Sequence, residues 1–249
     1  MDWSEQVFNY CERALDPSFW AEPVNALTNI AFLAAAVIAG VTLRRRPPDA
    51  DAVSAGEWLA IWMLIALVAI IGVGSFLFHT FATRWALIAD VAPITLFMAA
   101  YLAYALRMFL RCGWIVLMLA VPAFLGLGAV VSSLTCARNL ATSGLAQAEL
   151  PPAALPCFNG SLGYAPALAA LFVIGAIMIC RGLPAGRKVL AAGGVFSVSI
   201  VLRTVDRELC NATRFLDHAW GTHALWHVLN AVTLYILLSA AIETHRRRP

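Results

Sequence analysis

Three histidines at the ends of apolar segments are the residues of this sequence best suited to chemistry. His79 closes a long apolar run, and His223 and His227 open the last apolar run of the chain. A histidine inside a membrane-spanning segment is costly and is usually functional. On a helix, His223 and His227 share one face at the spacing of paired metal ligands. Three neutral imidazoles with an open fourth position form the ligand set of a catalytic zinc site, at which a bound water ionises near neutral pH.

Two other polar residues lie close to His79 along the chain. Ser75 precedes it by four residues and therefore shares its helix face. Asp90 follows it across a predicted helical hairpin, so antiparallel helices would hold both residues at a similar depth. The sequence has no HExxH motif to supply a general base, and Asp90 is the only acid that we expect within reach. We predict Asp90 as the general base and Ser75 as a donor to a developing oxyanion.

Each of these residues also has a purely structural explanation. A lone intramembrane histidine can bond a neighbouring hydroxyl group, and Asp90 or Ser75 alone could serve helix packing. The convergence of several such residues at one end of a bundle is what favours a site. His218 is expected in a loop and His245 in solvent, so neither is predicted as a ligand. Gly72 and Gly74 are interpreted as points of close helix packing.

The composition places the chain in lipid. Of its 249 residues, 61% are hydrophobic and 12% are charged, and the mean hydropathy is +0.80. A soluble domain carries about 25% charged residues. We therefore predict one integral membrane domain over residues 1–249, with a lipid as partner and no nucleic acid.

Seven segments are long and apolar enough to span a bilayer, which takes about 20 residues. The predicted fold is an all-α, seven-transmembrane helix bundle that follows an outer N-terminal segment over residues 1–22. The sixth span is the weakest, and Arg203, Asp206 and Arg207 at its end must lie at the interface or pair with one another. The predicted spans cover residues 23–43, 58–79, 85–106, 112–132, 164–180, 187–206 and 220–242.

Basic residues set the predicted orientation, because positive charge accumulates in cytoplasmic loops. Alternate loops are basic, which places the N-terminus outside, the C-terminus in the cytoplasm and the histidines in the outer half of the bilayer. The acidic N-terminal segment lacks the basic start of a cleavable signal peptide. Abundant arginine and alanine hint at a bacterial protein, so we expect an inner membrane with the site toward the periplasm. The basic inner positions are Arg44–Arg46, Arg107, Arg111, Arg181, Arg187, Lys188 and Arg246–Arg248.

Cysteine placement agrees with this orientation. Cys11, Cys136, Cys157 and Cys210 fall on the predicted outer side, where an oxidising compartment would permit two disulfide bonds. The alternative is that these four are free buried thiols. The other two cysteines, Cys112 and Cys180, lie near the predicted inner side, where thiols stay reduced.

Taken together, the pattern Ser75-x-x-x-His79, Asp90 and His223-x-x-x-His227 resembles the alkaline ceramidase family. That family belongs to a wider group of seven-span metal hydrolases that includes the adiponectin-receptor-like proteins. The N-terminal stretch is also similar, with Asn9-Tyr10-Cys11-Glu12 followed by Trp20-Ala21-Glu22. The resemblance covers essentially the whole chain.

The resemblance implies a zinc ion held by His79, His223 and His227, with Asp90 as the base and Ser75 as the oxyanion donor. It also implies a calcium ion bound through Glu12, Glu22 and Asn9, although the family has an aspartate where Asn9 stands and the loop before Glu22 is shorter in this chain. For the disulfides, the resemblance implies a bond between Cys11 and Cys210, which leaves Cys136 to pair with Cys157.

We therefore expect a hydrolase that cleaves the amide of ceramide, or of a related N-acyl lipid entering from the bilayer, to a fatty acid and a long-chain base. One alternative is a seven-span lipid receptor or sensor with a structural zinc ion. A catalytic site needs a base as well as a metal, and the presence of Asp90 therefore favours the enzyme. Another is a metal or proton transporter, which would need polar residues along the inner half of the spans, where almost none occur. The oligomeric state is left open by the sequence.

Overall fold

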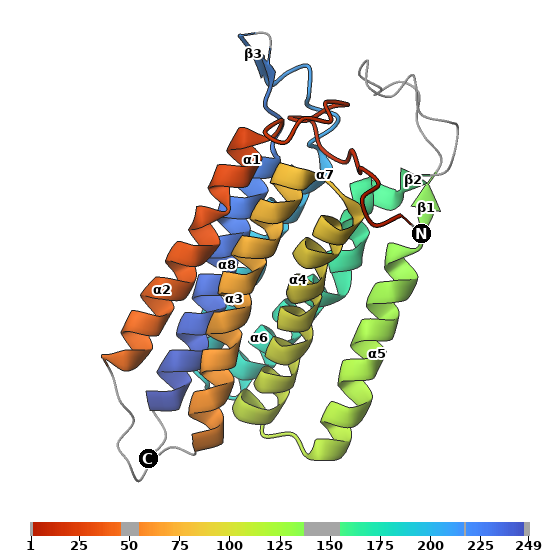
Figure 1. The fold of residues 1–249 in the computed structure, drawn as a ribbon. Helices are drawn as coiled ribbons and strands as arrows, with labels where there is room; N and C mark the ends of the chain where they lie inside the picture. Colours follow the sequence, from red (N-terminus) through yellow and green to blue (C-terminus); the bar gives the residue numbers. More distant parts are fainter. Residues whose placement is uncertain (1, 46–54, 137–154, 217, 247–249) are drawn as a thin grey trace.

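The computed structural model is a bundle of membrane-length helices and describes residues 2–45, 55–136, 155–216 and 218–246 (Figure 1). Helices make up 74% of the structure, and seven of the described segments are long and apolar enough to cross a membrane. The predicted all-α, seven-span fold class is therefore confirmed. The chain is a multi-pass membrane protein.

Helices form the bundle, and two short two-stranded sheets lie in the connections between them. In chain order the elements are α1 (Pro23–Thr28), α2 (Ile30–Arg44), α3 (Ala55–Phe81), α4 (Arg84–Tyr104), the π-helix η1 (Ala105–Phe109), α5 (Trp114–Ser132), β1 (Thr135–Cys136), β2 (Leu155–Pro156), the 3₁₀ segment η4 (Cys157–Tyr164), α6 (Ala165–Cys180), α7 (Ala185–Thr204), β3 (Arg214–Phe215), β4 (His218–Ala219) and α8 (His223–Arg246). Strand β1 pairs antiparallel with β2, and β3 pairs antiparallel with β4.

The last helix lies at the centre of the arrangement. Helix α8 packs against α7, α2, α1 and α3, and it is the most buried of the seven described spans. Helix α5 stands at the edge of the bundle (Figure 1) and is the least buried span. The last helix thus meets the first ones, and residues from both ends of the sequence can share one site.

The sixth and seventh spans have different ends from those predicted. Helix α7 ends at Thr204 rather than at residue 206, and α8 begins at His223 rather than at residue 220. Asp206 leaves the helix because its carboxylate accepts hydrogen bonds from the first backbone N–H groups of α8. Gly221 precedes α8 with a φ of +66°, and a Cβ atom there would overlap Asp206 Oδ1. A residue with a side chain would disrupt this turn.

Two glycines of α3 allow the close helix packing that the sequence predicted. A Cβ atom on Gly74 would overlap the carbonyl oxygen of Ala89 in α4. A Cβ atom on Gly72 would lie 3.0 Å from the Cβ of Phe32 in α2. The contact at Gly74 matters for the site because its neighbour Ser75 and the residue after Ala89, Asp90, are thereby brought together.

The N-terminal segment, residues 2–22, lies across one end of the bundle (Figure 1). It pairs with the α3–α4 connection, where Val7 N–H donates to Ala82 O at 2.7 Å and Arg84 N–H donates to Glu5 O at 3.0 Å. This end also carries the α7–α8 connection. The segment is therefore a cover fixed to the bundle rather than a free tail.

Two disulfide bonds lie in these connections. One joins Cys11 to Cys210, with 5.6 Å between their Cα atoms, and the other joins Cys136 to Cys157, with 4.9 Å. These are the two pairs that were expected. Among the described cysteines, Cys112 and Cys180 are free, also as expected. The first bond fastens the N-terminal segment to the connection that precedes α8.

The basic residues predicted to face the cytoplasm lie at the opposite end of the helices. There Lys188 Nζ lies 2.5 Å from Glu243 Oε1, and Arg181 donates to the carbonyl oxygen of Leu110. Three of the predicted inner arginines, at positions 46, 247 and 248, lie outside the described residues. That this end faces the cytoplasm stays a prediction.

Candidate metal centre

The three predicted histidines meet in one buried cluster. His79 lies in the last turns of α3, and His223 and His227 lie in the first two turns of α8. Their side chains are 0%, 1% and 1% exposed. Each ring offers one nitrogen, and these three nitrogens all lie within 4.8 Å of one another. In a tetrahedral zinc site the ligand nitrogens are roughly 3.3 Å apart. The cluster could hold a metal ion.

Hydrogen bonds to the outer nitrogens fix the tautomers of two of these rings. Thr28 Oγ1 donates to the carbonyl oxygen of Val24, so it accepts the hydrogen bond from His227 Nδ1 at 2.9 Å. Likewise, His79 Nδ1 lies 2.5 Å from Glu22 Oε2. Both rings therefore carry their proton on Nδ1 and keep the Nε2 lone pair for another partner.

The remaining nitrogens have no partner within the described part of the chain. These are Nε2 of His79, Nε2 of His227 and Nδ1 of His223, all of them buried. Buried polar atoms are almost always hydrogen-bonded or bound to a metal. Three such atoms in one cluster, one from each ring, could therefore serve together as the donor set for a metal ion.

Glu22 is held as a carboxylate against His79. Burial by itself raises the pKa of the Glu22 carboxyl, but the electrostatic interaction with His79 and the hydrogen bonds from His79, Arg13 and Asn25 outweigh burial and keep this pKa below its ordinary value. A carboxylate behind a histidine fixes the ring orientation and increases its basicity toward a metal.

Asp90 and Ser75 lie beside the histidines, as predicted. The two side chains interact with each other, and both line a small cavity together with His223, His227 and Tyr10. Asp90 is 7% exposed and comes from α4, whereas Ser75 comes from α3. The close approach of these helices at Gly74 brings the carboxylate and the hydroxyl into the same cavity.

Asp206 positions the helix that carries two of the histidines. Its Oδ1 accepts hydrogen bonds from the backbone N–H groups of Thr222 and His223 at 2.7 and 2.9 Å, and its Oδ2 accepts one from Cys11 N–H at 2.9 Å. A carboxylate here satisfies the free amides at the start of α8 and complements the helix dipole. It also ties the N-terminal segment to that helix.

Asp206→Ala is expected to lower the free energy of unfolding by roughly 2 kcal/mol, because three buried N–H groups lose their acceptor. Asp206→Asn should cost less, since its one oxygen still accepts from part of this set. Thermal unfolding of the purified protein measures the order wild type, Asn, Ala. An Ala variant that unfolds at the wild-type temperature would show that the cap contributes nothing to stability.

The N-terminal segment contributes a residue that sequence reasoning missed. The Tyr10 ring stacks on His223 with 3.6 Å between ring centroids, and it lies 5.2 Å from the His79 ring. Tyr10 thus covers the cluster from the side of the segment. The signal in the sequence was its place between Asn9 and Cys11, but the spacing of residues did not show which side chain would face the histidines.

Arg203 is a second missed residue, although its charge inside a predicted span was a signal. Its Nη1 donates to Asn159 O at 2.8 Å and to Ser161 Oγ at 2.9 Å. The guanidinium lies over the rings of Tyr164 and Trp226 and borders the cavity that contains Asp90. Arg203 therefore adds a fixed positive charge to the wall of the site.

The residues predicted to bind calcium lie at this end of the bundle. Glu12 accepts hydrogen bonds from the backbone N–H groups of Val24 and Asn25 at 2.7 and 2.8 Å. Both oxygens of Glu22 are also engaged, and Asn9 lines the cavity beside the histidines. These partners would compete with an added ion, and the calcium site stays a prediction. His218 is not part of the cluster, as expected, although it lies in the short strand β4 rather than in a loop.

A comparison with family models matches residues 2–147 to the family described as Ceramidase. The match covers more than half of the chain and includes Ser75, His79 and Asp90, whereas His223 and His227 lie beyond it. A comparison with curated proteins found no match.

Proposed function

The chain belongs to the ceramidase family, and from this premise we propose that it is a zinc-dependent amidohydrolase that cleaves ceramide or a related N-acyl lipid. Membership of the family supports a ceramide-hydrolysing function in general. The observation that carries the finer proposal is the cluster of three buried histidines beside Asp90.

The donor set fits zinc. Three neutral imidazole nitrogens that lack other partners match the ligands of a catalytic zinc site with an open fourth position. Glu22 and Thr28 behind two of the rings supply the outer contacts typical of such sites. When bound, a zinc ion would polarise the amide carbonyl and lower the pKa of a water molecule toward neutrality.

The protein's own side chains supply the proton transfers. Asp90 accepts a proton from the water that attacks the amide carbonyl, and it then gives this proton to the nitrogen of the leaving base as the C–N bond breaks. Ser75 donates a hydrogen bond to the carbonyl oxygen as negative charge develops there. The products are a fatty acid and a long-chain amine.

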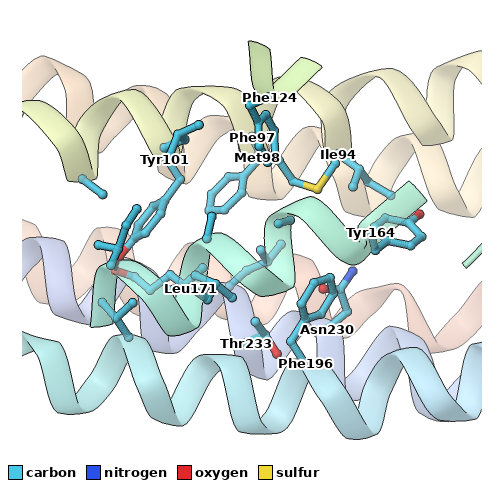
Figure 2. Close-up of a pocket in the computed structure, with 18 of the residues that line it drawn as sticks. Ile94, Phe97, Met98, Tyr101, Phe124, Tyr164, Leu171, Phe196, Asn230 and Thr233 are labelled. Atoms are coloured by element: carbon cyan, nitrogen blue, oxygen red, sulfur yellow. Dashed lines mark hydrogen bonds between the residues drawn. The ribbon is translucent and has the colours of Figure 1, made fainter. Parts of the chain in front are cut away.

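An apolar cavity that continues from the site supports a substrate with a long hydrocarbon chain. Ile94, Tyr164 and Asn230 border both this cavity and the polar one that contains Asp90. In Figure 2, Tyr164 and Asn230 lie toward one end of the apolar cavity and Tyr101 toward the other. Nearly all of its remaining lining is apolar and comes mostly from α4, α6, α7 and α8, with single residues from α3, η1 and α5. An acyl or sphingoid chain in this cavity would place its amide near the histidines.

Incubation of the purified, zinc-loaded protein with N-acyl lipids of several chain lengths tests the proposal. We expect release of equal amounts of fatty acid and long-chain base from ceramide, detected by mass spectrometry. A chelator should stop the release and added zinc should restore it. Fully zinc-loaded protein that releases fatty acid from none of the amides would contradict the proposed function.

A further inference from the structure

Arg13 is a buried cation outside the set of residues that the proposed reaction uses. It lies in the N-terminal segment with a side chain that is 1% exposed, among the largest fully buried side chains of the described chain. Burying a guanidinium is costly unless every N–H group finds an acceptor. A buried charge at this position therefore needs an explanation from its contacts.

The Arg13 guanidinium is surrounded by oxygen atoms. Its Nε donates to Glu22 Oε1 at 2.6 Å, and its Nη1 donates to the carbonyl oxygens of Asp16 and Ser18 at 3.1 and 2.7 Å. Its Nη2 donates to the carbonyl oxygens of His79 and Thr80 at 2.9 and 3.3 Å. A guanidinium has five N–H groups, and these contacts use all of them.

These contacts reach the metal ligand His79 along two paths. Arg13 holds one oxygen of Glu22 while the other oxygen lies against His79 Nδ1. Arg13 also binds the carbonyl oxygen of His79 itself, in the last turns of α3, where a positive charge complements the helix dipole. The ring and the backbone of one histidine are thus positioned by the same cation.

We propose that Arg13 positions Glu22 and His79 for metal binding. Its guanidinium supplies positive charge at this end of the bundle and takes the place of a bound divalent ion. Loop carbonyls together with a carboxylate are the oxygen donors that calcium prefers. In this chain these oxygens accept hydrogen bonds from the Arg13 guanidinium instead. The carboxylate of Glu12 accepts hydrogen bonds from two backbone N–H groups. The segment over the site is fastened by a side chain of its own.

The inference rests on the proposed metal site, and it is tested by metal affinity measured without substrate. The protein purified in detergent is stripped of metal, and zinc binding is measured by competition with a chelator of known affinity. Arg13→Met should weaken zinc binding by about 10–100-fold, the cost typical of losing an outer contact of a metal ligand. Arg13→Lys keeps the charge but cannot reach all five oxygens, so its zinc affinity should fall between wild type and Arg13→Met.

Arg84→Gln is the matched control. Arg84 also pairs with an acid of the N-terminal segment, since its Nη2 lies 2.8 Å from Glu5 Oε2, but these side chains are 41% and 54% exposed. Loss of this pair should leave zinc affinity near the wild-type value. An equal loss in Arg84→Gln and Arg13→Met would assign the effect to general loosening of the segment and would overturn the positioning role.

A double-variant cycle separates positioning from loss of fold. Because Arg13 acts in part through Glu22, the loss of zinc affinity in Arg13→Met/Glu22→Gln should be smaller than the sum of the two single losses, whereas independent roles would give additive losses. Additive losses would contradict the inference. Arg13→Met that retains affinity within about twofold of wild type, well below the expected range, would also contradict it.

Calcium provides a test on the wild-type protein that needs no variant. We expect its unfolding temperature and zinc affinity to be unchanged across a titration with calcium chloride, because the oxygens already surround Arg13. A rise in unfolding temperature with calcium would overturn the replacement of a bound ion. Wild-type protein that binds no zinc at all would instead refute the proposed metal site, and the two failures are thereby distinguished.

Discussion

Asp90→Asn is expected to abolish amide hydrolysis while zinc remains bound. The asparagine keeps the shape of the side chain and its contact with Ser75, but it cannot accept the proton that the attacking water must lose. General-base assistance contributes about 10²–10⁴-fold to a rate, so the loss of kcat should be of at least that order. Product release from ceramide and the zinc content of the same preparation are the two measurements.

Ser75→Ala is the companion variant for this experiment. It should reduce kcat by less than Asp90→Asn does, because water or a backbone donor can replace part of one hydroxyl. An Asp90→Asn protein that turns over ceramide near the wild-type rate would place the base elsewhere. One that loses zinc would make Asp90 a metal ligand, and the histidine-only set would have to be redrawn.

The second large effect is expected for His223→Ala/His227→Ala, which should remove zinc and all hydrolytic activity. His79 alone offers one nitrogen, whereas catalytic zinc sites have three protein ligands. Metal analysis of the purified double variant should fall from near one zinc per chain to a trace. His218→Ala is the control, since this histidine lies outside the cluster, and it should retain its zinc. Zinc that survives in the double variant at wild-type content would refute the assignment of the site.

The meeting of the histidines could be predicted from the sequence because it depends on features with simple periodicity. His79 and His223 each lie at one end of an apolar helix, and the alternation of spans places these ends on the same side. Helical spacing then places His227 on the face of His223. The pair of Ser75 and Asp90 follows from the hairpin between α3 and α4 in the same way.

The contacts behind the histidines could not be predicted in this way. Glu22 lies 57 residues before His79, in a segment without helical periodicity, and its partner is set only when the segment folds over the bundle. The resemblance to a family assigned Glu22 to a calcium site, but it did not indicate the contacts that Glu22 makes with Arg13 and His79. The pattern of apolar residues placed Asp206 at the end of the sixth span, whereas its carboxylate caps the start of the following helix, α8. Tertiary hydrogen bonds of this kind leave no pattern along the chain.

The packing of α8 against the first helices sets the order in which a newly made chain can become an enzyme. His79, Asp90 and the N-terminal segment are synthesised long before residue 223, yet the cluster is incomplete until the last helix is inserted. The disulfide between Cys11 and Cys210, whose partners are 199 residues apart, must also wait for that stage. Under the proposed function, metal binding therefore follows insertion of α8, and a partly inserted chain cannot act on the lipids of the membrane in which it is being made.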